Sequence, residues 1–214
     1  MTDPHRFSSD VAFTPAVKAI QARKGSREAY AKVEEDGGWR KTIDDRLTAF
    51  LAETNSLYLA TATADGQPYI QHRGGPRGFV KILDKNTLAF ADYSGNRQFL
   101  TQGNLSENSK AHIFVMDYTR RRRVKIWGEA RVVEDDPALL QSLMPSGYRA
   151  RPEQVIIFKV AAWDTNCAQH IPQKFDAADV AVALDQREAR IAELEAEIVR
   201  LKSQSLNCAS IEDE

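Results

Sequence analysis

The stretch that decides the fold is LYLATATADGQPYIQHR, residues 57–73. Leucine and threonine occupy every second position from Leu57 to Thr63, and this period of two is typical of a β-strand with one buried face. Asp65-Gly66 follows, and Asp-Gly between two β-rich runs is the strongest short-range sign of a hairpin. The sequence therefore predicts two antiparallel strands joined at this dipeptide, with the return strand from Gln67 to Arg73.

Further apolar runs, separated by turn residues, continue the pattern along the chain. More strands are expected at Phe79–Leu83, Thr87–Ala91, Ala111–Met116, Arg122–Val133 and Val155–Val160. Apolar residues at helical spacing, preceded by capping residues, predict helices that begin near Pro15, Ser26, Thr42, Asn96 and Pro137. This succession of elements indicates an α+β fold built on a small antiparallel β-barrel.

The chain divides into three parts by the character of its patterns. Residues 1–54 are expected to form a helical segment that packs on the barrel, residues 55–178 the barrel, and residues 179–214 a C-terminal helix and tail. In the last part, apolar residues recur at coiled-coil spacing, at Leu184, Ile191, Leu194, Ile198 and Leu201. This pattern is compatible with a helix pair between subunits and also with a helix that lies on its own barrel.

Composition excludes several classes of protein. With 43% hydrophobic and 28% charged residues the chain is typical of a globular domain, and no apolar run approaches the roughly 20 residues of a membrane span. Met1–Ser9 has no apolar core and is therefore not a secretory signal, and two cysteines make no disulfide framework, so a cytoplasmic protein is expected. With a net charge of -1 and no broad basic surface, the chain is not expected to bind nucleic acid.

Four consecutive arginines, Arg120–Arg123, lead into the strand Arg122–Val133. Alternate side chains of a strand share a face, so Arg121, Arg123 and Lys125 are expected on one side. Apolar residues continue this strand, which favours a fixed anion contact over a solvated edge, and the planar guanidinium fork suits a phosphate.

Two further polar segments interrupt the β-rich region. Gln71-His72-Arg73 ends a strand at Gly74-Gly75, where the glycines let a ligand approach the backbone, although a bulged hairpin is the alternative. Asn96-Arg97-Gln98, at an expected helix start, combines unpaired amides with a cation. Together with the arginine strand these segments predict an anion site. Cys167 and His170 have no second ligand pair at zinc spacing, so no metal site is expected.

The order of these motifs resembles the FMN-binding split β-barrel family of pyridoxamine 5'-phosphate oxidase, in its poorly characterised flavin-nucleotide-binding branch. The resemblance covers Leu57–Val133. The matching parts are Gly66-Gln67-Pro68, Gly78-Phe79, Phe90–Arg97, Asn104-Leu105 with Asn108, and Arg122–Gly128. The family has a Ser-Arg-Lys phosphate grip in the third of these parts and Arg-Gln-Val-Arg-x-x-Gly in the last.

The resemblance implies an antiparallel split β-barrel with peripheral helices, and a homodimer with FMN at the subunit interface. By position, the residues implied to contact the cofactor are Gln71, His72, Arg73, Ala91, Asp92, Asn96, Arg97, Gln98, Arg123, Lys125 and Trp163. Of these, Asn96, Arg97 and Gln98 would hold the phosphate. Trp163, expected just after the last strand, would cover the ring. No catalytic residue is implied.

The sequence also departs from the family. Gly74-Gly75 stands where the family has apolar residues and a lysine, Gln98 stands where a second cation is usual, and the signature that grips the pyridoxal substrate is not visible. FMN binding is therefore better supported than oxidation of pyridoxamine phosphate. Three functions stay open: an FMN-dependent oxidoreductase acting on an unidentified small molecule, a non-catalytic flavin-binding or flavin-sensing dimer, and a barrel adaptor that holds a phosphorylated ligand. A deazaflavin or haem in place of FMN also stays open.

Overall fold

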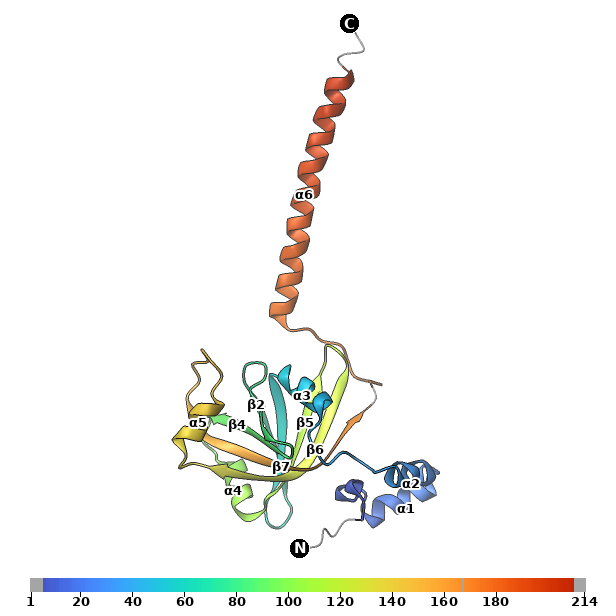
Figure 1. Cartoon of the computed structure of the whole chain (residues 1–214), viewed down its shortest axis with the longest axis vertical. Helices are drawn as coiled ribbons and strands as arrows, with labels where there is room; N and C mark the ends of the chain where they lie inside the picture. The colour runs from blue at the N-terminus through green and yellow to red at the C-terminus, as the bar shows by residue number, and fades with distance from the viewer. Residues whose placement is uncertain (1–5, 167, 210–214) are drawn as a thin grey trace. The chain divides into compact units, whose positions relative to one another are not determined.

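The computed structural model describes residues 6–166 and 168–209. Within them, seven strands form one antiparallel sheet in the order β2-β1-β5-β6-β7-β4-β3. Figure 1 shows this sheet and the helices of the chain. The strands are β1 Ser56–Ala62, β2 Pro68–Gly74, β3 Lys81–Asp84, β4 Thr87–Tyr93, β5 Lys110–Asp117, β6 Arg122–Val133 and β7 Pro152–Asn166. The predicted α+β fold with an antiparallel sheet is confirmed.

A 3-10 helix and six α-helices accompany this sheet in the described residues. They are η1 Ser8–Val11, α1 Pro15–Arg23, α2 Arg27–Glu35, α3 Asp45–Ala52, α4 Leu100–Glu107, α5 Pro137–Leu143 and α6 Ala177–Ala209. The chain up to Ile171 forms one compact unit that contains the sheet, and the chain from Pro172 forms a second that contains α6.

The hairpin at Asp65-Gly66 is present as predicted. β1 and β2 pair in register from Ser56 opposite Gly74 to Ala62 opposite Pro68. Gly66 has φ +93°, a left-handed conformation that glycine adopts without strain. The turn residues therefore fix which side chains of β2 point inward.

The sheet curls so that distant strands meet. β2 is an edge strand and β4 lies five places away in the sheet order, which is roughly 24 Å in a flat sheet at about 4.8 Å per strand. Nevertheless, Arg73 Nε at the end of β2 lies 2.6 Å from Asp92 Oδ1 on β4. The two ends of the sheet therefore face each other around one interior, as a barrel requires.

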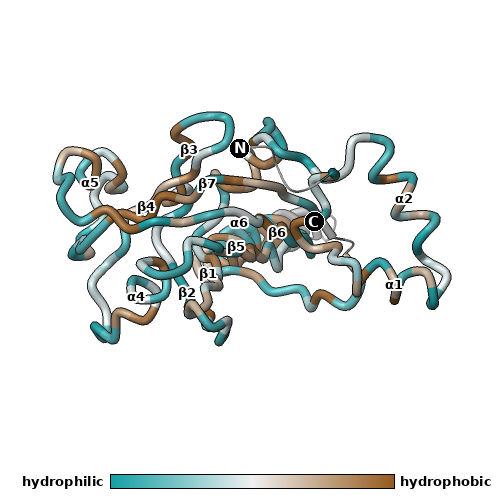
Figure 2. The backbone as a smooth tube through the Cα atoms, turned by 90° about the horizontal axis from the view of Figure 1, so that it is seen from below, coloured by the Kyte–Doolittle hydropathy of each residue, from teal (hydrophilic) through white to brown (hydrophobic). Residues whose placement is uncertain are grey.

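The hydrophobic core fills that interior. Inward residues of β1 and β6, among them Leu57, Leu59 and Ile126, are fully buried. Leu47 and Leu51, one helical turn apart on α3, pack against the same cluster. Figure 2 shows hydrophobic segments, in brown, along β1, β4 and β7. The predicted apolar stripe of the third helix thus closes the barrel.

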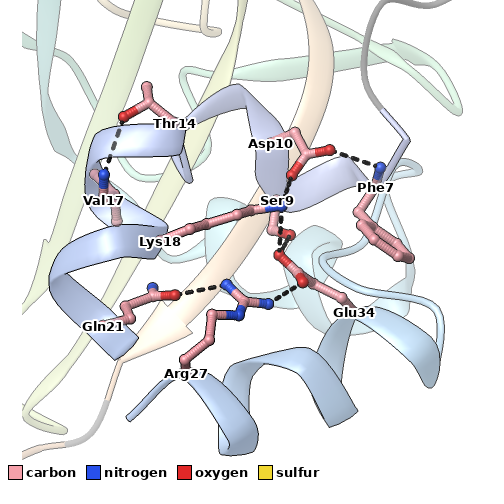
Figure 3. A network of polar contacts seen from close by, with 9 residues as sticks. All are labelled: Phe7, Ser9, Asp10, Thr14, Val17, Lys18, Gln21, Arg27 and Glu34. Atoms are coloured by element: carbon pink, nitrogen blue, oxygen red, sulfur yellow. Dashed lines mark hydrogen bonds and ion pairs between the residues drawn. The ribbon is translucent and has the colours of Figure 1, made fainter. Parts of the chain in front are cut away.

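A buried carboxylate joins the N-terminal elements. The side chain of Glu34 on α2 is 4% exposed, and it contacts Arg27 and, at 3.2 Å, the amino group of Lys18 on α1. Ser9 Oγ in η1 donates to the same carboxylate at 3.3 Å, and Lys18 also reaches Asp10 Oδ1 at 2.6 Å (Figure 3). One acidic group therefore holds η1, α1 and α2 together.

Aromatic stacking attaches the segment after α2 to the outer face of β6. The rings of Trp39 and Trp127 are nearly parallel, with centroids 4.5 Å apart, and Phe13 meets Trp39 edge-on at 4.9 Å. The amino group of Lys125 lies 5.4 Å and 5.1 Å from the centroids of these two tryptophans. Ring contact and the nearby cation stabilise this docking.

Two expected helix starts are wrong. The third helix begins after Asp44, whose carboxylate accepts the N–H of Leu47, and not at Thr42. The fourth begins at Leu100 and not at Asn96, because the Asn96 side chain accepts the N–H of Gln98 in a local turn. Gly103 lies inside this helix.

The last strand is longer than predicted. β7 continues beyond Val160 because β6 is long and pairs with it as far as Arg123 opposite Asn166. Trp163 therefore lies within β7, opposite Ile126, and does not follow the last strand.

Candidate functional site

A polar cluster lies where β2, β4, β7 and α4 meet. Asp92 on β4 and Gln154 on β7 are register partners, and Gln154 Nε2 donates to Asp92 Oδ2 at 3.0 Å. Arg73 at the end of β2 contacts the other oxygen of Asp92. Arg73 Nη2 also donates to Thr101 Oγ1 at 3.4 Å, and this hydroxyl donates to Gln71 Oε1 at 3.2 Å. Four elements converge here, so the cluster exists only when the barrel is closed.

The Arg73–Asp92 pair is almost withdrawn from solvent, with side chains 13% and 8% exposed. Burial raises the pKa of the Asp92 carboxyl, and the opposing effects of Arg73 and Gln154 do not cancel it. Arg73 Nε lies 2.6 Å from Asp92 Oδ1, and Arg73 Nη2 donates to Asp92 Oδ2 at 3.4 Å, so both carboxylate oxygens contact the guanidinium group. This ion pair fixes the Arg73 side chain at the edge of the site.

The loop between β4 and α4 forms the rim of the site. Arg97 and Phe99 have φ angles of +57° and +54°, a left-handed backbone conformation that residues other than glycine rarely adopt. Arg97 is 69% exposed, and its nearest acidic oxygen, on Glu153, is 4.0 Å away. Phe99 occupies the N-cap position of α4 and forms no side-chain hydrogen bond there. The first amides of the helix, which begin at Leu100, are therefore not capped by this side chain. A loosely paired cation and uncapped amides together favour an anion.

Cluster and rim enclose a small hollow. Its volume is about 50 Å³, whereas pockets that enclose a small molecule hold roughly 300–1,000 Å³. Six residues predicted from the sequence line it: Gln71, Arg73, Asp92, Asn96, Arg97 and Gln98. One chain therefore offers an open cradle for part of a ligand.

The other five predicted residues are not among those that line the hollow. Neighbours along a strand point to opposite faces, which separates His72 from Arg73 and Ala91 from Asp92. His72 lies beside Tyr58 on the outer face, with ring centroids 5.8 Å apart. Ala91 is buried in a second apolar cluster that includes residues of α5.

Arg123 and Lys125 belong to β6, away from the hollow. Lys125 forms an ion pair with Asp164 at 3.4 Å, in addition to its tryptophan contacts. Arg123 lines a separate cavity of about 510 Å³ beside α3. Trp163 is 1% exposed, and its indole N–H donates to Thr42 O at 2.8 Å, so it serves the core. Within one chain these three side chains do not line the cradle.

Thr101 and Gln154 belong to the cluster but were not predicted. Gln154 is a single polar residue directly before the apolar run from Val155, and only the pairing of β7 with β4 brings it to Asp92. Thr101 lies next to the predicted polar loop, and its role depends on the true start of α4 at Leu100. The sequence shows where each residue lies along the chain, but not which side chain it contacts in the fold.

An apolar patch covers the outer face of β2, β1 and β5. Ile70 is 59% exposed and Tyr58 is 36% exposed. Tyr58 is paired across the strands with His72 on one side and Phe114 on the other. Aromatic and aliphatic side chains thus lie together on a surface that the barrel itself leaves open.

We expect acid to destabilise the protein partly through His112, which borders this patch. Its ring lies 4.9 Å from that of Trp127, and burial, followed by the charge of Lys125, lowers the pKa of His112 from 6.5 to about 4. The unfolded chain then binds a proton that the folded chain does not. Stability should therefore fall as pH drops from about 6.5 to about 4, by up to roughly 3 kcal/mol.

Urea unfolding of the wild type and of His112→Gln at pH 7 and at pH 4 measures this effect. The variant has no imidazole to titrate, so its free energy of unfolding should fall less over that range. Equal losses in both proteins would show that His112 takes no part.

Within the described residues, no three His, Cys, Asp or Glu side chains are grouped to hold a metal ion, and Cys167 lies outside those residues. None of the described helices has the length and apolar character needed to cross a membrane. The polar cluster is therefore the site that these residues build most completely.

A sequence model of the family described as pyridoxamine 5'-phosphate oxidase matches residues 43–167, more than half of the chain. The chain belongs to the pyridoxamine 5'-phosphate oxidase family. The resemblance drawn from the order of motifs is thereby confirmed. A search of curated proteins found no match.

Several solved structures are similar to this member of the pyridoxamine 5'-phosphate oxidase family. HupZ from Group A Streptococcus is 20% identical, with 62% of this chain and 99% of that chain covered and a TM-score of 0.47. General Stress Protein 26 from Bacillus anthracis is 15% identical, with 56% and 91% covered and a TM-score of 0.43. An FMN-binding protein from Syntrophomonas wolfei is 11% identical, with 68% and 97% covered and a TM-score of 0.42.

Proposed function

We propose that this chain binds FMN in the cradle and acts as an FMN-dependent oxidoreductase on an unidentified small molecule. The observation that carries the proposal is the exposed, loosely paired Arg97 beside the uncapped start of α4, on the rim of a hollow that Gln71 and Arg73 also line. FMN has a hydroxyl-rich ribityl chain and a terminal phosphate dianion, and these need hydrogen-bond donors and positive charge. When bound, FMN would supply the electron or hydride transfer.

The charges of the residues that line the hollow suggest which part of FMN each of them binds. Arg97 and the first amides of α4 hold the phosphate, since Arg97 has only a distant acid as a partner. Gln71, Arg73 and Thr101 orient the ribityl chain. Asp92 neutralises Arg73 and fixes its side chain, so it positions a donor and contributes no free negative charge to the phosphate.

A homodimer with the cofactor at the subunit interface fits this cradle. About 50 Å³ cannot enclose a flavin, so a second surface has to cover the ring. The exposed Ile70 and Tyr58 lie on the other face of the same β2–β1 hairpin, and covering them would bury apolar area. Arg123 and Lys125, which do not line the hollow of their own chain, are proposed to reach the cofactor of the partner subunit.

A non-catalytic flavin-binding or flavin-sensing dimer is the second candidate. The acids that line the hollow are Asp92, which is held by Arg73 and Gln154, and Glu153 on its border. Neither is placed as a free general acid or base. A flavin-binding protein without turnover needs no such group.

Anaerobic reduction separates the two candidates. The FMN-loaded protein is mixed with NADH or NADPH without oxygen, and the loss of flavin absorbance near 450 nm is followed before air is admitted. An oxidoreductase should bleach with at least one donor and recover its colour in air. A flavin that neither donor reduces would support the binding role.

We expect Arg97→Ala to weaken FMN binding by about tenfold or more, because a charge-assisted contact to the phosphate is lost. Riboflavin lacks the phosphate, so its affinity should not change. Quenching of flavin fluorescence measures both constants, and Arg23→Ala, which removes an exposed arginine from α1, is the matched control. An equal loss for riboflavin, or no loss for FMN, would place the phosphate elsewhere.

A further inference from the structure

Helix α6 carries a stripe of exposed apolar side chains along one face. Its members, between 41% and 55% exposed, are Val180, Leu184, Ile191, Leu194, Ile198 and Leu201. They are spaced four, seven, three, four and three residues apart, as in the a and d positions of a heptad repeat. A helix of 33 residues is about 50 Å long, and helices gain most of their stability from packing such a stripe.

We propose that α6 pairs with α6 of a second copy of this chain as a parallel, in-register, two-stranded coiled coil. The a positions are Leu184, Ile191 and Ile198, and the d positions are Val180, Arg187, Leu194 and Leu201. β-Branched residues at a with leucine at d favour two strands. Arg187 is the one charged member of the seam, and its long stem can lie along the interface with its guanidinium in water.

The charges that flank the seam select the parallel orientation. In a parallel pair, each g position faces the e position five residues later on the partner helix. Arg190 then meets the partner subunit's Glu195, and Glu197 meets the partner subunit's Lys202. Both contacts are attractive, and the twofold axis repeats each of them.

An antiparallel pair sets the e positions against each other. It also sets the g positions against each other. With Ile191 opposite the partner subunit's Leu194, Glu188 approaches the partner subunit's Glu195, which is repulsive, while Arg190 approaches the partner subunit's Glu197, which is attractive. The two contacts offset each other, whereas both contacts of the parallel pair are attractive. The ion pairs within one helix do not distinguish the two orientations: Arg190 binds Glu193 at 2.8 Å, and Arg200 binds Glu197 at 2.5 Å.

The pairing of α6 stands on this helix alone and does not depend on flavin binding. Val182 and Val199 are also exposed but fall outside the a and d positions, so they belong to no second seam. If the barrel dimerises as well, a closed dimer requires both interfaces to share one twofold axis.

Cysteine cross-linking of the full-length protein tests orientation and register. In a Cys167→Ser/Cys208→Ser background, Ile191→Cys and Leu194→Cys are each oxidised alone and as an equal mixture, with Ala189→Cys as the outward control. A parallel pair brings each residue opposite its own copy, within disulfide reach, so both single variants should cross-link about tenfold faster than the control. Cross-linking confined to the mixture would mean an antiparallel pair. No excess over Ala189→Cys would overturn the proposal.

Charge reversal gives a second readout that does not alter the seam. Glu195→Arg sets the introduced guanidinium against Arg190 of the partner subunit, so it should lower the unfolding midpoint of α6 by several degrees. The double variant Arg190→Glu/Glu195→Arg should recover it. All three tryptophans precede Pro172, so their fluorescence reports the barrel, and a loss of ellipticity at 222 nm that occurs without a fluorescence change reports α6. A higher midpoint for Glu195→Arg would indicate the antiparallel pair and overturn the proposal.

Discussion

Replacing Arg73 with alanine is expected to lower the free energy of unfolding by about 3 kcal/mol or more. The substitution would leave the carboxylate of Asp92, whose side chain is 8% exposed, buried without its countercharge. Gln154 alone would then satisfy it. Because Arg73 also lines the hollow proposed to hold FMN, the same variant should lose FMN affinity.

The double variant Arg73→Ala/Asp92→Asn separates charge from packing. Removing the buried charge should recover part of the stability, because an amide is less costly to bury than an unpaired carboxylate. Urea unfolding at pH 7 measures all three proteins. If the double variant is no more stable than Arg73→Ala, the buried charge is not the cause of the loss.

The pH dependence of Arg73→Ala gives a further check. Burial already raises the pKa of Asp92 and Arg73 opposes this, so without Arg73 the pKa should rise further. A raised carboxyl pKa in the folded state means that protonation stabilises the fold as pH falls. The deficit of Arg73→Ala relative to wild type should therefore shrink toward acid pH, and a constant deficit would contradict this explanation.

Gly128→Ala is expected to have the other large effect, a loss on the order of 3 kcal/mol or more, or no folded protein at all. A β-bulge between Trp127 and Gly128 brings β6 very close to β7. A Cβ at Gly128 would lie 2.0 Å from Lys159 O and 2.6 Å from Phe158 Cε1. The main chain of β7 cannot move aside without breaking the sheet.

Gly103→Ala is the matched control for that substitution. Gly103 lies inside α4, and a Cβ there meets nothing within 4 Å. Alanine in an open helical position should stabilise the chain by about 0.5–1 kcal/mol, so the same chemical change has opposite signs at the two sites. Thermal unfolding of both variants measures this contrast, and similar midpoints would contradict it.

The sequence predicted the strands well because local patterns determine them. The alternation from Leu57 to Thr63 and the turn at Asp65-Gly66 fixed the first hairpin, and the apolar run at Val155 fixed the last strand. Its length was underestimated because β7 extends by pairing with β6, which is a long-range effect. The start of α4 was misjudged because Asn96 forms a local turn in place of a cap.

The candidate site was predicted only in part, because contacts between distant strands form it. Arg73 and Asp92 were both named, but their contact joins strands five places apart in the sheet, and no local pattern reveals it. His72 was grouped with Arg73 because both were assigned by their position in the family's motif. Side chains alternate between the faces of a strand, so the two residues point to opposite sides. Arg123 and Lys125 can take part only if a second subunit supplies the cradle.

FMN titration of the purified wild-type chain tests the central claim most directly. Protein freed of any bound flavin is titrated with FMN, and the bound fraction is read from the flavin absorption band and from equilibrium dialysis. The account predicts saturable binding of one FMN per chain, with a shifted visible spectrum and weaker binding of riboflavin. A protein that stays colourless and binds no FMN under these conditions would contradict it.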